Sequence, residues 1–240
     1  GGTYSASPAG LALNPATGAI TPGTSAAGIY TITYTIPASG GCPAIPVTTT
    51  VTITELPTAG IAYLGGPFCE NDLTARNVTL SGTNGGTYAV SPSTGLIINS
   101  TTGSFVPNGS APGVYTITYT IPASGGCAQV SASTSVTITD LPTASIFYSG
   151  SPYCTSVTSP QPVALTGTGN YSGGTYASSA PGLTINSSTG SITPSTSAAG
   201  TYTVTYTKPG AGGCANLVST TTVTISQAPS AVITYAGGPF

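Results

Sequence analysis

The sequence predicts an all-β protein made of tandem immunoglobulin-like β-sandwich repeats of about 85 residues each. The stretch VYTITYTIPASGGC at residues 114–127 recurs almost unchanged at 29–42 and in a looser form at 201–214. Within it, Tyr and Ile alternate with Thr, which is typical of a half-buried antiparallel strand. Gly (33 residues) and Pro (21 residues) separate short apolar segments that show no helical periodicity.

The period of the repeat follows from the cysteines. Three of them end a Gly-Gly-Cys motif and lie 85 and 87 residues apart, and two others follow a Pro-aromatic pair. The first group is Cys42, Cys127 and Cys214, and the second group is Cys69 and Cys154.

Connectors that carry proline divide the chain. We expect a partial repeat at residues 1–57 that lacks its N-terminal strands, and complete Ig-like repeats at 58–142 and 143–228. The first strand of a following repeat is expected at residues 229–240. The connectors are short and proline stiffens them, so the array is predicted to be a semi-rigid rod. These units are called the first, second and third repeats below.

Within the second repeat the sequence predicts about seven short strands. They are expected at residues 61–64, 77–80, 86–90, 95–99, 103–106, 115–122 and 135–140, with the turn NSTTG between the fourth and the fifth. The side chains that face inward are expected to be Tyr115, Ile117, Tyr119 and Ile121 on one strand and Val136 and Ile138 on the last.

One tyrosine follows a glycine turn at the entry to the penultimate strand of each repeat. These residues are Tyr30, Tyr115 and Tyr202. They fit a tyrosine corner, in which the hydroxyl bonds to the backbone a few residues upstream. An ordinary core tyrosine explains the same pattern equally well.

The segment GLALNPATGAITPGTSAAGIYTITYTI at residues 10–36, with its equivalents at 95–121 and 182–207, resembles the Ig-like and cadherin-like repeats of large bacterial surface proteins. The aromatic-Cys and Gly-Gly-Cys framework resembles the PKD-like and Ig-like repeats of giant secreted adhesins of Bacteroidota. The resemblance covers the whole chain. It implies export, anchoring at a distant terminus and a stalk or adhesin role, with no catalytic residues to carry over.

Ionisable side chains are scarce, which limits the possible chemistry. Only 2% of the residues are charged, the net charge is −2, and there is no His. A Ser–His or Cys–His nucleophile pair therefore cannot be built. The chain has no basic patch for phosphates and no apolar run of about 20 residues, so neither nucleic-acid binding nor membrane insertion by this segment is expected. Clustered metal ligands are also missing, and no metal or cofactor is predicted.

The closest pair of carboxylates is Glu70 and Asp72, in a loop of the second repeat. Glycosidases need two carboxylates that flank a cleft, and calcium sites normally need several carboxylates together. The third repeat lacks both residues, so a solvated loop is expected. The chain is therefore predicted not to be an enzyme.

Cysteines at repeat-locked positions predict disulfides and an oxidising, extracellular compartment. Their spacing favours bridges within repeats, Cys69–Cys127 and Cys154–Cys214, with the partner of Cys42 outside the chain. In a plain immunoglobulin strand order, however, the two positions of one repeat lie at opposite poles. A bridge between neighbouring repeats, from Cys69 to Cys214, is the alternative.

Three functional hypotheses follow. The first is a structural repeat segment of a long extracellular bacterial surface protein, with neighbouring repeats as partners. The second is a self-assembling subunit of an extracellular filament or sheath, because little charge opposes packing between copies. The third is a module that binds surface glycans, for which Tyr88 and Tyr176 are the best candidates for exposed aromatic platforms.

Overall fold

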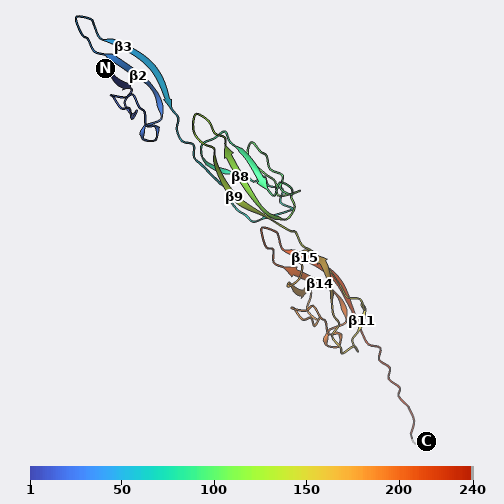
Figure 1. Ribbon diagram of the computed structural model, residues 1–240. Coiled ribbons are helices and arrows are strands. Elements are labelled where there is room, and N and C mark those ends of the chain that lie inside the picture. Colours follow the sequence, from blue (N-terminus) through green and yellow to red (C-terminus); the bar gives the residue numbers. More distant parts are fainter. Residues whose placement is uncertain (239–240) are drawn as a thin grey trace.

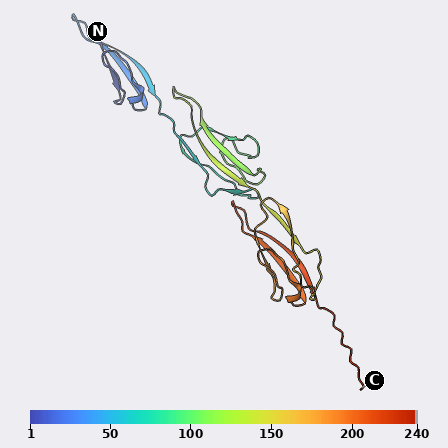
Figure 2. The same cartoon turned by 60° about the horizontal axis from the view of Figure 1, so that its bottom comes forward.

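The computed structural model describes residues 1–238 and shows β-rich repeats that follow one another along an elongated array (Figure 1, Figure 2). The first joint lies between β3 (Ile45–Ile53) and β4 (Ala59–Ala62). The second joint lies between β9 (Val130–Thr139) and β10 (Thr143–Phe147). Each connector contains a proline, which fixes φ and limits how far the joint can bend.

The second repeat is a sandwich of a two-stranded and a four-stranded sheet. Its remaining strands are β5 (Phe68–Cys69), β6 (Thr79–Gly82), β7 (Thr87–Ser91) and β8 (Gly113–Ile121). One sheet pairs β4 with β6, and the other has the order β5-β9-β8-β7. All pairs are antiparallel except β5 with β9, which run parallel. This architecture confirms the predicted all-β immunoglobulin-like class.

The third repeat has the same architecture. Its strands after β10 are β11 (Tyr153–Cys154), β12 (Ala164–Thr168), β13 (Thr175–Ser178), β14 (Gly200–Lys208) and β15 (Leu217–Ser226), with the 3-10 turn η2 (Pro194–Thr196) before β14. The sheets have the orders β10-β12 and β11-β15-β14-β13. Again the short strand that carries the cysteine, β11, is parallel to its neighbour β15.

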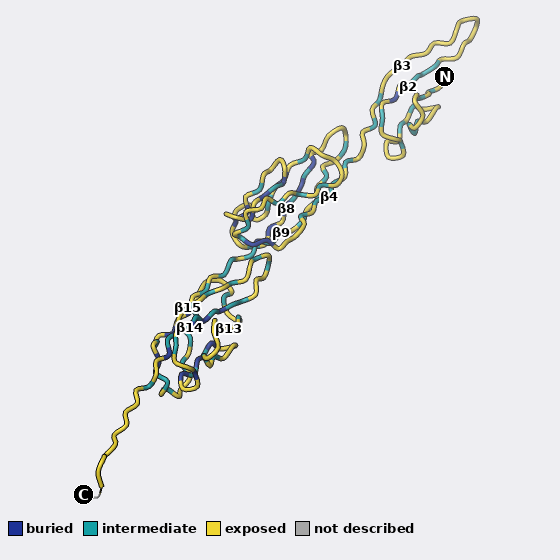
Figure 3. Tube along the Cα trace, turned by 180° about the vertical axis from the view of Figure 1, so that it is seen from behind, coloured by how far each residue is buried: buried dark blue, intermediate teal, exposed yellow. Residues whose placement is uncertain are grey.

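The first repeat has a single three-stranded sheet, β1 (Thr3–Ser7), β2 (Gly28–Ile36) and β3, with the 3-10 turn η1 (Pro22–Thr24). Tyr30 is the only hydrophobic residue in the described part of this repeat that is buried. Figure 3 shows the contrast, since buried segments are concentrated in the other two repeats. No second sheet of the described chain covers the face of β2 and β3 that carries Tyr30. Ile45 and Val47, on β3, are accordingly more than half exposed.

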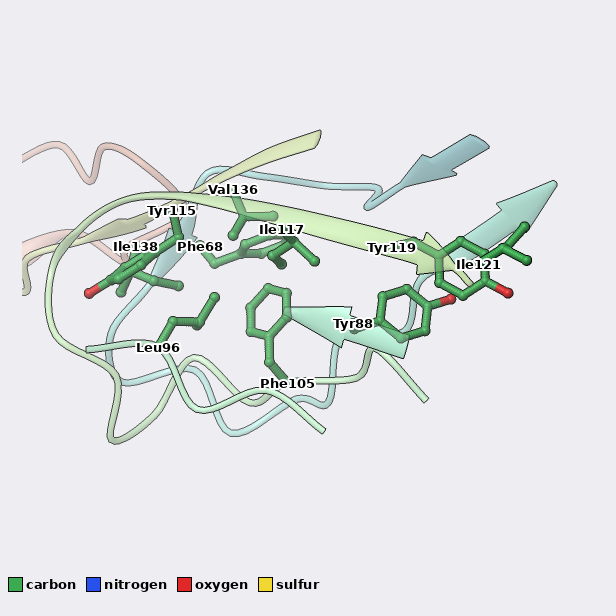
Figure 4. Close-up of a cluster of buried hydrophobic side chains, with 10 residues drawn as sticks. All are labelled: Phe68, Tyr88, Leu96, Phe105, Tyr115, Ile117, Tyr119, Ile121, Val136 and Ile138. Atoms are coloured by element: carbon green, nitrogen blue, oxygen red, sulfur yellow. The ribbon is translucent and has the colours of Figure 1, made fainter. Parts of the chain in front are cut away.

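The core of the second repeat lies between its two sheets, and all six side chains predicted to face inward are buried in it (Figure 4). Alternate residues of β8 supply four of them, and β9 supplies the other two. Ile117 has no exposed surface and Tyr119 only 1%. The period-two alternation of the sequence was therefore sufficient to identify the inner face of this sheet.

The tyrosine at the entry to the penultimate strand forms a tyrosine corner in all three repeats. The hydroxyls of Tyr30, Tyr115 and Tyr202 each donate a hydrogen bond of 2.8–2.9 Å to the carbonyl oxygen four residues upstream. Each of these tyrosines is also buried. The predicted tyrosine corner is therefore confirmed, and the alternative of an ordinary core tyrosine is not. The corner hydrogen bond fixes the chain where it enters β2, β8 and β14.

The predicted hairpin around the turn NSTTG is not a strand pair. Residues 95–99 and 103–106 share the isolated bridge between Ile98 and Phe105 and the hydrogen bond from the Asn99 amide to the Ser104 carbonyl, but they form no strand ladder. Each complete repeat therefore has six strands, fewer than the seven expected. The Asn99 side chain accepts hydrogen bonds from the amides of Thr101 and Thr102, which tightens the turn without extending a ladder.

Candidate functional site

The second joint is closed by a disulfide between Cys69 of the second repeat and Cys214 of the third, whose Cα atoms are 4.8 Å apart. The favoured expectation of bridges within repeats was therefore wrong, and the alternative between repeats is the one observed. Cys127 and Cys154, the expected partners, are free in the described chain. Cys42 is also free and is exposed.

The position of β5 explains why a bridge within the repeat is impossible. Cys69 lies opposite Thr139, the last residue of β9, whereas Cys127 precedes the first residue of that strand. A ten-residue strand is about 30 Å long, and disulfides need Cα atoms within about 7 Å. Cys69 is thus placed at the pole that faces the third repeat.

The Gly-Gly-Cys loop of the third repeat reaches back across the joint. Gly212 and Gly213 have φ angles of +60° and +81°, in the left-handed region that favours glycine. A Cβ atom on Gly213 would lie 2.5 Å from the Pro67 carbonyl oxygen, so only glycine allows this approach. The Cys214 Sγ lies 3.6 Å from the carbonyl oxygen of Asp140, in the connector itself.

Glu70 anchors the connector from the side of the second repeat. Its backbone amide donates to the Thr139 carbonyl at 3.0 Å, and its Oε1 accepts a hydrogen bond from the Leu141 amide at 3.0 Å. The expectation that Glu70 lies in a solvated loop was therefore wrong. An amide of the connector that would otherwise face solvent is tied to the residue beside the disulfide.

The same contact recurs beyond the third repeat with a different side chain. Thr155 follows Cys154 as Glu70 follows Cys69, and its Oγ1 accepts from the Ala228 amide at 2.9 Å. A carboxylate and a hydroxyl thus fill the same role, because the position needs only an acceptor. In the sequence, the residue that binds the connector amide could have been found by its position directly after the cysteine, and not by its residue type.

Phe68, next to the disulfide, is held among side chains of its own repeat. It is 2% exposed, its ring lies 5.7 Å from that of Phe105, and the Arg76 guanidinium covers it at 4.7 Å. Arg76 also forms an ion pair with Asp72. The hydrogen bond from the Thr74 backbone amide lowers the pKa of the Asp72 carboxyl most, and the hydrogen bond from the Arg76 side chain lowers it further. Asp72 is thus part of a structural pair.

The free thiol of Cys154 lies at the far pole of the third repeat. The Ser156 hydroxyl donates a hydrogen bond to its Sγ at 3.1 Å, and this lowers the pKa of the thiol. A lower pKa raises the fraction of thiolate, which is the form that attacks disulfides.

Other candidate sites find no support in the geometry. Tyr88 and Tyr176 are each only 6% exposed, so the expectation of exposed aromatic platforms for glycan was wrong. Their rings pack on Tyr119 and Tyr206 of the neighbouring strand. Residues 1–238 contain no group of three or more acidic or Cys side chains that could hold a metal ion. The described chain also has no helix that is long and apolar enough to span a membrane.

Comparisons with known proteins return structures but no family. No protein-family model matches the chain, and no curated protein matches it. The EC1–4 segment of Drosophila N-cadherin is 9% identical over 95% of this chain and 67% of its own length, with a TM-score of 0.32. Human protocadherin-24 EC1–2 is 14% identical over 72% of this chain and all of its own, with a TM-score of 0.37. A SusE-like surface-located polysaccharide-binding protein of Bacteroides thetaiotaomicron is 15% identical over 94% of this chain and 43% of its own, with a TM-score of 0.29.

Proposed function

We propose that this chain is a non-catalytic structural segment of a long extracellular bacterial surface protein, in which it forms part of a stalk or fibre. The observation that carries the proposal is the disulfide from Cys69 to Cys214, which adds a second covalent connection across a joint. A bridge at that place fixes the relation between repeats, which is of use to a spacer and not to an isolated binding domain. Disulfides also persist mainly in oxidising compartments outside the cytoplasm.

The packing at the joint supports a rod. The connector between β9 and β10 has three residues, one of them proline. Around it lie the disulfide, the Gly-Gly-Cys loop and the hydrogen bond from the Leu141 amide to Glu70. Bending at this joint would have to break several of these contacts at once. A stiff joint holds a distant binding end away from a cell surface.

Labelling of cells tests the proposal. Antibodies raised against residues 58–228 should bind intact cells of the source organism, and gold-labelled secondary antibodies should lie along thin projecting rods in electron micrographs. Labelling only after the cells are opened would refute a surface location. Labelled compact particles in place of rods would refute the stalk.

Lateral self-assembly is a second candidate function, favoured by the open edge of β9. The strand β5 pairs with only the last two residues of β9, Ile138 and Thr139, and no other strand of residues 1–238 lies along the rest of that edge. Side chains along that edge are mostly Ser and Thr, so no charge repels a second strand. Light scattering should then show assembly that grows with concentration, whereas monomers at every concentration would exclude it.

A further inference from the structure

The first joint contains a cavity of about 820 Å³ between the first repeat and the Gly-Gly-Cys loop of the second. Apolar side chains of the first repeat line it, among them Ile20, Val51 and Ile53. On the other side lie Gly125, Gly126 and Cys127. The free Cys127 thiol therefore lies at the wall of a mainly apolar cavity at the joint, whose lining also includes Thr54 and Glu55.

The second joint shows what such a space accommodates. There the position of Ile53 is taken by Ile138, and the position of Ile20 is taken by Phe105. Phe68 lies in register with Ile138 and packs on Phe105. The walls of the first cavity thus correspond to the residues that enclose Phe68 at the second joint.

The two Gly-Gly-Cys loops have the same backbone shape but different surroundings. Gly126 and Gly213 both have φ of +81°. A Cβ atom on Gly213 would meet the backbone of residues 67–69, whereas one on Gly126 would have no atom within 4 Å. The loop at the first joint is therefore already in the shape that receives a Pro-aromatic-Cys segment.

The thiol of Cys127 is also in the bonding position. Its Sγ lies 3.7 Å from the carbonyl oxygen of Glu55, and the Cys214 Sγ lies 3.6 Å from that of Asp140, the equivalent residue. Because Cys214 forms its disulfide from that place, Cys127 is oriented to form one with a thiol seated in the cavity.

We propose that this cavity is a docking site for a Pro-aromatic-Cys segment from another repeat of the same kind. The segment would run parallel to the end of β3, place its aromatic ring against Ile20 and Ile53, and bond its cysteine to Cys127. Tyr63 and Tyr148 donate hydrogen bonds to the carbonyls of Gly103 and Gly190. The equivalent tyrosine of the docked segment has the Gly18 carbonyl as its acceptor.

The covalent step is an exchange of thiols with a low-molecular-weight disulfide such as oxidised glutathione. The thiol of the segment and that of Cys127 are oxidised to one disulfide, and the glutathione disulfide is reduced. The two protons released pass to the two glutathione thiols that form. The docking proposal depends only on the geometry of the first joint, whereas the proposed stalk role rests on the disulfide at the second joint. If the peptide does not dock in the cavity, the proposed stalk role therefore still stands.

A peptide of residues 59–72, AGIAYLGGPFCEND, tests the proposal on the intact 240-residue chain. Peptide and protein are incubated in a glutathione redox buffer, the thiols are blocked, and peptide maps quantify the mixed disulfides. We expect at least tenfold more peptide on Cys127 than on Cys42. Cys42 is a matched internal control because it ends the same ASGGC loop but is exposed and does not line this cavity.

Two variants separate docking from simple thiol reactivity. The peptide with Phe68→Ala should label Cys127 and Cys42 equally, because it lacks the ring that fills the cavity. The protein variant Gly126→Ala should lose the preference, since its methyl group would meet the backbone of the docked segment. Equal labelling of the two cysteines by the unmodified peptide, or an undiminished preference with the Ala peptide, would overturn the proposal.

Discussion

Mechanical extension of the array should depend on the disulfide between Cys69 and Cys214. When the ends of the chain are pulled, force passes through this bridge, and the polypeptide enclosed by it bears no load. The two cysteines are 145 residues apart, and an extended chain spans at most about 3.5 Å per residue, so the bridge withholds about 500 Å. The variant Cys214→Ala removes the bridge and should release that length.

The parts of the second and third repeats that lie outside the segment closed by the disulfide add almost nothing to the extension. Residues 58–68 and 215–226 reach about 80 Å at full extension, while two folded repeats with ten-residue strands, together with the three-residue connector between them, already span about 75 Å. Oxidised protein should therefore show no appreciable lengthening when the second and third repeats unfold. The sandwiches could lose their packing under load and the rod would keep its length.

Single-molecule force spectroscopy, with handles fused to the termini, measures this directly. We expect contour-length gains from the second and third repeats that total about 500 Å only in Cys214→Ala or after reduction. Cys127→Ala, which removes a free thiol, is the matched control and should behave as the parent chain. Gains of this size in the oxidised parent protein would refute the load path.

The joint, the buried phenols and the tyrosine corner each give a further test. Gly213→Ala should lower the yield of the inter-repeat disulfide on oxidative refolding, because its Cβ would press on the Pro67 carbonyl, whereas Gly126→Ala, with the same φ, should leave that yield unchanged. Burial raises the pKa of Tyr148, so the fold favours the neutral phenol; the contribution of this tyrosine to stability should be constant below pH about 10, where the unfolded tyrosine begins to ionise, and should fall as the pH rises further. Denaturant titrations from pH 8 to 12 check this, and Tyr148→Phe should flatten the fall. Tyr202→Phe should destabilise the third repeat by about 1 kcal/mol through the lost corner hydrogen bond, measured as a shift of its urea midpoint; an unchanged midpoint would contradict that role.

The sequence was most informative where one physical rule acted alone. Alternation along residues 115–121 identified the inner face of β8, because a strand sends successive side chains to opposite sides. The glycine turn before Tyr115 predicted the corner for a similar reason, since the contact spans only four residues. Local patterns of this kind need no knowledge of the rest of the fold.

The joint was harder to predict, because its contacts cross from one repeat to the next. Two residues, Phe68 and Cys69, are too few to show any periodicity, so β5 and its parallel pairing with β9 were missed. Spacing along the chain made Cys127 the nearer partner of Cys69, yet the length of β9 separates the two. Glu70 was likewise assigned to solvent, because nothing local indicates a connector amide 71 residues away.

The placing of the paired cysteines in different repeats also sets an order of events during folding. Cys69 reaches the joint through the pairing of β5 with the end of β9, so the second repeat must assemble its sheet before Cys69 can meet Cys214. Core packing alone must therefore hold each sandwich at first. The disulfide then forms only where two folded repeats have met in the correct orientation. An intact bridge is therefore a covalent marker of two repeats that have docked correctly.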